Sequence, residues 1–146
     1  MNNMIIGGIN LEHLEAVKFY LFGDVKFLHL LILLMALDII TGIAKAIKDQ
    51  NLWSRKSLFG YARKVLVLVV VVLANVIDQI LDLNGMVAYA TVLFYIANEG
   101  LSITENLAQV GVLVPQNIAE KLKHIETGTN KVRDDIKEEF SEGDDK

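Results

Sequence analysis

The stretch VLVLVVVVLA at residues 65–74 decides the fold of this chain, because it is ten apolar residues long without a break. Six of the ten are valine, a residue enriched in β-strands, so a buried strand is one interpretation. Strands, however, usually run for about five or six residues, and this stretch continues into Val76 and Ile77. A long apolar helix is therefore the favoured interpretation, and it predicts an all-α fold.

The charges on either side of this stretch are segregated along the sequence. None of the 14 Lys and Arg residues lies between residues 65 and 118, and the last 28 residues hold nine of the 18 acids. Hydrophobic residues make up 53% of the 146-residue chain, and its mean hydropathy is +0.40. A soluble domain of this length spreads its charges over its surface. The pattern therefore indicates a small polytopic membrane protein with a charged C-terminal tail.

Three apolar segments are long enough to cross a bilayer as helices, namely residues 27–44, 65–81 and 86–101. The first of them reaches ~27 Å as a helix at about 1.5 Å per residue, close to a hydrocarbon thickness of ~30 Å. Asn84 and Gly85 form a strong turn signal between the second and third segments. We therefore expect residues 27–101 to be the transmembrane part of the chain.

The N-terminal segment, residues 1–26, is predicted to form an amphipathic helix at the membrane surface. Its apolar residues recur at helical spacing between acids, Asn10 is a candidate N-cap, and Gly23 is a candidate stop. A helix packed on another part of the protein is an equal alternative. A fourth span over residues 5–22 is a weaker one, because its acids would lie in lipid. The segment lacks a positively charged beginning, so no cleavable signal peptide is expected.

Residues 102–126, beyond the third span, are expected to form amphipathic helices. The spacing of a capping box starts the first, a glycine ends it, and a proline opens the next. The residues of this motif are Ser102, Glu105, Asn106, Gly111 and Pro115. The Thr-Gly-Thr-Asn sequence at 127–130 is interpreted as a linker, and residues 127–146 as a charged, flexible cytoplasmic tail.

The loop at residues 45–64 predicts the orientation in the membrane. It holds six Lys and Arg residues against one acid, Asp49, and loops rich in Lys and Arg stay in the cytoplasm. The N-terminus and the Asn84 turn are then outside and the C-terminal tail is inside. Trp53 and Tyr61 suit the headgroup level. Nucleic-acid binding is not expected, because the chain carries a net charge of −4 and only one short basic loop.

Asp38 is an acid well inside a predicted span, where an Asp costs about 2.5–3.5 kcal/mol on insertion scales. Asp38 and Glu99 both fall toward the cytoplasmic side, where Arg63 and Lys64 enter the bilayer. We therefore hypothesise an intramembrane cluster of the two acids with Arg63 or Lys64, joining helices within a subunit or between subunits. The alternative is that each group extends separately to the interface.

Further polar or small residues within the spans are candidates for helix association in lipid. Thr41 and Gly42 share a helical face with Asp38, and a second polar stripe follows the valine-rich stretch at i, i+3, i+4 and i+7 spacing. The candidates are Asp38, Thr41, Gly42, Asn75, Asp78, Gln79, Asn98 and Glu99.

No residue pattern in the sequence supports an enzyme. The chain has no cysteine, its three histidines are scattered, and it lacks a phosphate-binding glycine loop, an HExxH motif or a recognisable nucleophile with its base. We expect a non-enzymatic protein without a metal or other cofactor.

Two blocks of the sequence resemble the toxin-secretion/phage-lysis holins, a bacteriophage holin family of Gram-positive hosts. The first is LDIITG at residues 37–42, followed by Ser57, Gly60 and Lys64. The second is YIANEGLSITEN at residues 95–106, followed by Gly111 and Pro115, and its Asn-Glu-x-x-Ser-x-x-Glu-Asn spacing is the more specific of the two. The resemblance covers about residues 30–125.

The resemblance implies a multi-pass protein of the host cytoplasmic membrane that forms homo-oligomers and opens lesions. A cytoplasmic endolysin then reaches the peptidoglycan, a functional link that needs no direct contact. The stripe from Asn75 to Asp82 is a candidate lining for such a lesion. The rival interpretations are a small oligomeric transporter or ion channel that uses Asp38 or Glu99 as an intramembrane acid, and a membrane regulator such as an antiholin.

Overall fold

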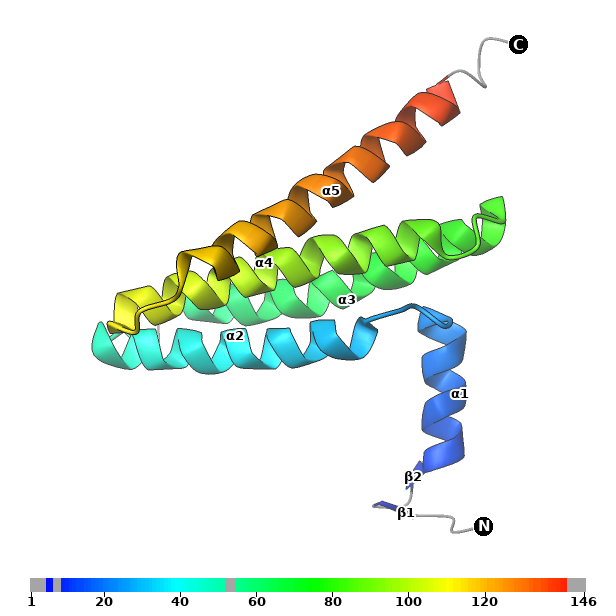
Figure 1. Cartoon of the computed structure of the whole chain (residues 1–146). Helices are drawn as coiled ribbons and strands as arrows, with labels where there is room; N and C mark the ends of the chain where they lie inside the picture. The colour runs from blue at the N-terminus through cyan, green and yellow to red at the C-terminus, as the bar shows by residue number, and fades with distance from the viewer. Residues whose placement is uncertain (1–4, 7–8, 52–54, 142–146) are drawn as a thin grey trace.

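The architecture comes from a computed structural model, which describes residues 5–6, 9–51 and 55–141. Trp53, expected at the headgroup level, lies outside the described residues, as do residues 142–146 of the tail. Figure 1 shows a bundle of long helices with a shorter helix set across one end. In chain order the elements are β1 (Ile5–Ile6), β2 (Ile9–Asn10), α1 (Leu11–Phe22), α2 (Leu28–Lys48), α3 (Arg55–Leu81), α4 (Met86–Val110) and α5 (Gln116–Ser141).

The three expected spans are confirmed as helices that are long and apolar enough to cross a membrane. They cover Leu28–Lys48, Phe59–Leu81 and Met86–Val110, and at most 28% of the residues in their most apolar stretches are buried inside the protein. The valine-rich stretch lies within α3, so the helical interpretation of it is correct. Because most apolar side chains of the spans face outward, the chain is a multi-pass membrane protein whose outer surface suits lipid.

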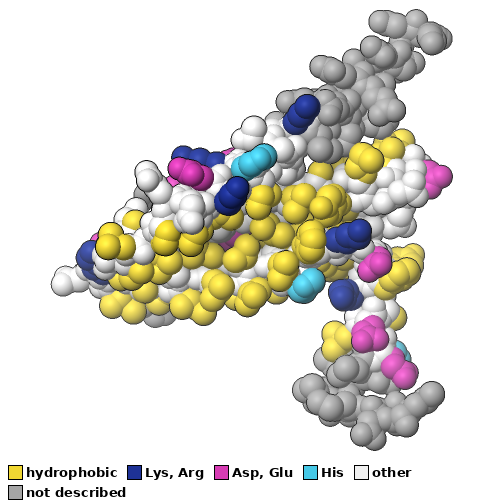
Figure 2. Space-filling model, viewed as in Figure 1, with side chains coloured by type: hydrophobic (Ala, Val, Ile, Leu, Met, Phe, Trp, Pro, Cys, Tyr) yellow, Lys and Arg dark blue, Asp and Glu magenta, His cyan; other side chains and the backbone are white. Residues whose placement is uncertain are grey.

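The core of the bundle is a small apolar cluster between the three spans. Leu31 on α2, Val71 on α3 and Val92 on α4 are fully buried. On the outside, side chains such as Leu73 are exposed over about half of their surface. Figure 2 shows such hydrophobic side chains covering the flank of the molecule formed by α2. Many more apolar side chains lie on the outer surface than in the core. This distribution is typical of a protein surrounded by lipid.

Helix α4 is longer than the sequence predicted, because the third span and the following amphipathic helix are continuous. The predicted helix start at Ser102 is wrong, since Ser102 and Glu105 lie inside α4. Thr104 donates its hydroxyl to the carbonyl of Leu101 at 2.7 Å, a bond made within a continuing helix. The helix ends where Gly111 adopts a φ of +96°, a conformation that glycine tolerates best.

Helix α5 is also continuous, so the linker predicted at residues 127–130 is wrong. Pro115 comes directly before α5, which runs through Gly128 without a break. Thr127 and Thr129 donate their hydroxyls to carbonyls four residues earlier, at 2.9 and 2.8 Å. These bonds satisfy the side chains within the helix, and helical residues on both sides outweigh the weak helix propensity of this short segment.

Helix α1 stands across the end of the bundle near the start of α2 (Figure 1). It ends at Gly23, whose φ is +61° and whose N–H donates to the carbonyl of Phe19 at 2.8 Å. Asn75 on α3 donates its side-chain amide to the carbonyl of Leu21 at 3.1 Å. The side chains of α1 are otherwise largely exposed, apart from Phe22, which packs against the bundle core.

Candidate functional site

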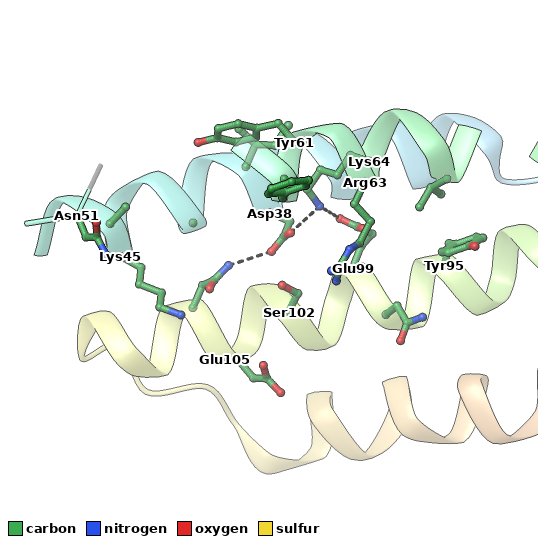
Figure 3. Close-up of a pocket in the computed structure, with 18 of the residues that line it drawn as sticks. Asp38, Lys45, Asn51, Tyr61, Arg63, Lys64, Tyr95, Glu99, Ser102 and Glu105 are labelled. Carbon is green, nitrogen blue, oxygen red and sulfur yellow. Dashed lines mark hydrogen bonds and ion pairs between the residues drawn. The ribbon is translucent and has the colours of Figure 1, made fainter. Parts of the chain in front are cut away.

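Lys64 on α3 joins the two acids that the sequence placed within spans. Its ammonium group lies 2.6 Å from Oδ2 of Asp38 on α2 and also forms an ion pair with Glu99 on α4. Figure 3 shows the lysine between the two carboxylates. Both acids are buried, at 9% and 8% exposure. Because the three side chains come from three helices, the cluster ties the spans together within one chain.

Arg63, the other cation considered from the sequence, makes no ion pair among the described residues. It is exposed, although it lines the same cavity as Lys64. Adjacent residues on a helix point about 100° apart, so only one of the two can face both α2 and α4. The structure selects Lys64 for that position.

Asn106 extends the cluster, although its spacing in the sequence predicts only a role in a helix cap. Its side-chain amide donates to Oδ1 of Asp38 at 2.9 Å and to the hydroxyl of Thr41 at 3.3 Å. Thr41 in turn donates to the backbone carbonyl of Asp38 at 3.1 Å. The signal was present, because Glu99 and Asn106 are seven residues apart and share a helical face. The capping-box spacing predicts only a local role for Asn106.

A half-open polar cavity of about 1070 Å³ lies beside this cluster. Lys45, Asp49, Arg63 and Glu105 contribute charges to its wall, and Gly42 and Asn98 also line it. Figure 3 shows Lys45 on α2, Arg63 on α3 and Glu105 on the C-terminal part of α4. A cavity with this lining suits water, so the ion cluster is reached from a polar space rather than sealed in an apolar core.

The second polar stripe divides into internal and exposed residues. Asp78 is buried and accepts hydrogen bonds from the N–H groups of Val87 and Ala88 at 3.0 and 2.7 Å, which caps the start of α4. Asn75 is buried and holds α1. Gln79 and Asp82 are exposed. Two residues of the stripe therefore hold helices together, and only Gln79 and Asp82 face outward.

The remaining polar contact between helix ends joins α2 to α4. Lys48 donates its ammonium group to the backbone carbonyl of Gln109. Together with the bond from Asn106 to Asp38, it fixes the C-terminal part of α4 against α2. Among the described residues, no group of three or more His, Cys, Asp or Glu side chains could hold a metal ion. The polar groups gathered here bind one another and hold helices together.

Comparison with known proteins identifies the family. A model of the bacteriophage holin family matches residues 16–127, which include all three spans and the ion cluster. A "Probable holin" of Bacillus phage phi105 is 56% identical over 119 residues, covering 82% of this chain and 88% of the phage protein. The uncharacterized protein YqxH of Bacillus subtilis is also 56% identical, over 81% of this chain and 84% of its own length.

More distant similarity extends to other bacteria. An uncharacterized protein of Clostridium perfringens is 39% identical over 110 residues, covering 73% of this chain and 82% of that protein. No solved structure matches the chain. The family match covers more than half of the chain and the phage relative is covered over most of its length. The chain therefore belongs to the bacteriophage holin family, a non-enzymatic family of the bacterial cytoplasmic membrane.

Proposed function

We propose that this protein forms homo-oligomers in the cytoplasmic membrane of its host bacterium and opens lesions that let a cytoplasmic endolysin, or a toxin, leave the cell. Membership of the holin family is the observation that carries this proposal. The link to the endolysin is functional, since a lesion that admits the enzyme requires no direct contact with it. Lysis of the host follows once the endolysin reaches the peptidoglycan.

The arrangement of polar groups supports harmless accumulation before lesions open. Lys64 neutralises one of the two buried acids, and Asn106 donates to Asp38. These intramembrane groups therefore have partners within a single chain, which lowers the cost of holding them in lipid. A monomer whose spans are apolar on the outside and whose buried acids are paired can collect in the bilayer without conducting ions.

The proposed orientation places the N-terminus outside and the C-terminal tail, residues 127–146, in the cytoplasm. It rests on the six Lys and Arg residues of the loop at 45–64, because positively charged loops are retained inside. Helix α1 then lies at the outer surface, where its exposed Phe19 and Tyr20 would meet the headgroup region. Fusing a reporter that is active only in the cytoplasm to each terminus tests this orientation.

The test of lesion formation is induced expression in a bacterium with and without a cytoplasmic endolysin. We expect abrupt loss of membrane potential in both strains and rapid lysis only in the strain that carries the endolysin. Selective uptake of a solute without lysis would favour the transporter or channel interpretation. If this chain delays the lysis that a second, co-expressed holin causes, it would favour the antiholin interpretation. Continued growth with a normal membrane potential, despite confirmed membrane insertion, would contradict the proposed lesion formation.

A further inference from the structure

Four charged side chains line the polar cavity without being paired with one another. They are two cations, Lys45 and Arg63, and two acids, Asp49 and Glu105. Within the part of the chain that the structure describes, none of the four forms an ion pair, and the ion pairs of this cavity are those of Lys64. These four charges therefore remain available to a charged ligand.

The cavity lies at the end of the bundle where the basic loop joins α2 to α3. Lys45 and Asp49 are at the end of α2, and Tyr61 and Arg63 are near the start of α3. Both helices pack mainly against α4 rather than against each other, and the cavity is half-open. Charged groups and tyrosine at one end of apolar helices are typical of the level of lipid headgroups. This level follows from the change from apolar to charged residues, so it is the same in either orientation of the chain.

The cationic part of the cavity has the chemistry of a phosphate site. Figure 3 shows Arg63 extending from α3 and Lys45 extending from α2, both toward α4. On α4, the side chains of Asn98 and Ser102 also line the cavity, and neither makes a hydrogen bond with another described residue. A guanidinium group can bind two phosphate oxygens at once, and an amide and a hydroxyl supply further donors. These groups suit the phosphate of a lipid whose headgroup lies at this level.

The acids of the cavity decide which phosphate-bearing headgroup fits. Three cations and four acids line it, so its net charge is −1. A headgroup whose only charge is its phosphate would add a further negative charge to a negative cavity. A headgroup that also carries an ammonium group adds no net charge, and its N–H groups can donate hydrogen bonds to the carboxylates of Asp49 and Glu105. A quaternary ammonium group lacks these donors, so the fit is to a primary amine.

We propose that the cavity binds a phospholipid headgroup that carries both a phosphate and a primary ammonium group, as phosphatidylethanolamine does. The phosphate contacts Lys45 and Arg63, and the ammonium group contacts Asp49 and Glu105. The cavity volume of about 1070 Å³ exceeds the ~300–1,000 Å³ typical of small-molecule sites, which leaves room for the headgroup and bound water. Phe59, which also lines the cavity and is 72% exposed, offers an apolar surface to the acyl chains. This inference goes beyond the proposed function, since lipid binding requires no lesion.

Lipid binding is measured with the purified, delipidated full-length chain in detergent. Phosphatidylethanolamine, phosphatidylcholine and phosphatidylglycerol with identical acyl chains are added in turn, and the rise in the thermal midpoint with lipid concentration gives each affinity. We expect phosphatidylethanolamine to bind about tenfold more tightly than either other lipid, the effect of one charge-assisted hydrogen bond. Binding of phosphatidylcholine or phosphatidylglycerol that equals or exceeds that of phosphatidylethanolamine would overturn the proposal, as would a midpoint that phosphatidylethanolamine does not raise.

Arg63→Gln tests the phosphate contact. Lys123→Gln is its matched control, because Lys123 is an exposed cation on α5 that does not line the cavity. We expect Arg63→Gln to weaken the binding of phosphatidylethanolamine about tenfold and Lys123→Gln to leave it unchanged. Both side chains are exposed, so the thermal midpoint without lipid should equal that of the unmodified chain in both variants. The same lipid affinity in the two variants would contradict the phosphate contact.

The double variant Asp49→Asn with Glu105→Gln tests the ammonium contact. It should lower the affinity for phosphatidylethanolamine to that for phosphatidylcholine, because the carboxylates that bind the amine are removed. Asp82→Asn with Glu120→Gln is the matched control, since both acids are exposed and lie outside the cavity. A preference for phosphatidylethanolamine that survives the loss of Asp49 and Glu105 would overturn the proposal. Binding is measured in detergent, so its failure is distinct from a failure to open lesions in cells.

Discussion

The ammonium nitrogen of Lys64 on α3 lies 2.6 Å from Oδ2 of Asp38 on α2. Lys64 also forms an ion pair with Glu99 on α4, so these charges link all three membrane-spanning helices inside the bundle. The side chains of Lys64 and Asp38 are only 14% and 11% exposed. A buried ion pair adds little when compared with an apolar replacement of both partners, but removing one partner leaves an unpaired charge.

Replacing Lys64 with methionine should therefore destabilise the bundle strongly. The change leaves two buried acids without their cation, and breaking a buried pair from one side costs about 3–5 kcal/mol. We expect a lower thermal midpoint in detergent and less protein in the membrane fraction. Arg63→Met is the matched control, because Arg63 is exposed and has no ion pair among the described residues. Equal loss in the two variants would argue against a special role for Lys64.

Exchanging the charges of the pair should rescue part of this loss. The double variant Asp38→Lys with Lys64→Asp keeps one cation and two acids at the site, since Glu99 is unchanged, and moves the cation from α3 to α2. Each single change, in contrast, leaves three like charges at the site or two cations with one acid. We expect the double variant to accumulate better than either single variant, measured by membrane fractionation and thermal unfolding. A double variant no better than the single ones would show that the pairing is not what holds these helices.

Asn106→Leu should weaken the contact between α4 and α2. The change removes the donor to Asp38 and Thr41, and loss of a partner for a buried acceptor costs about 1–3 kcal/mol. Gln79→Leu is the control, because this side chain is exposed. Thermal unfolding in detergent should separate the two, with a lower midpoint for Asn106→Leu only. A midpoint equal to that of the unmodified chain would indicate that Lys64 alone is enough to satisfy the Asp38 carboxylate.

Asp78→Ala should loosen the hairpin between α3 and α4. Its carboxylate caps the first N–H groups of α4, at 3.0 and 2.7 Å, and losing a cap costs about 0.5–2 kcal/mol. The exposed acid at the turn supplies the control as Asp82→Ala. Amide hydrogen exchange over the first turn of α4 should accelerate in Asp78→Ala and stay unchanged in Asp82→Ala. Protection that survives both changes would mean that the cap contributes little.

Asn75→Leu and Gln79→Leu separate the two roles open to the polar stripe. Asn75 is buried and bound to the carbonyl of Leu21, so its replacement should free α1 and increase proteolysis of that helix. Gln79 is exposed, so its replacement should leave α1 protected. If the stripe also lines a lesion, Gln79→Leu will change the timing of lysis. Unchanged timing would leave the stripe with a packing role only.

Much of the fold can be predicted from the sequence, because a membrane-spanning helix is recognised from the hydropathy of consecutive residues. The spans are bounded by charges and by the turn at Gly85, and both kinds of signal are local. The choice between Arg63 and Lys64 required the rotation of α3 relative to α2 and α4, which periodicity alone does not provide. The two acids could be expected to need a partner, since their cost in lipid is independent of packing.

The sequence predicted helix boundaries at positions where the helices in fact continue. Ser102 and Glu105 have the spacing of a capping box, yet α4 passes through them because nothing breaks the helix before Gly111. Glycine at position 100 weakens a helix on propensity grounds, but here it admits Leu122 from α5. The return of α5 along α4 is a tertiary contact, and a sequence that reads as amphipathic does not specify the surface on which it packs.

The cap at the start of α4 also has a consequence for the order of events during synthesis. Asp78 is made before the residues whose N–H groups it accepts, the first of which, Val87, lies nine positions later. At about 5–20 residues per second, a ribosome covers that interval in roughly half a second to two seconds. An unpaired carboxylate in lipid is costly. The cost of inserting α3 is therefore lower once Asp78 is bonded to the start of α4. We therefore expect α3 and α4 to enter the bilayer together, as one hairpin.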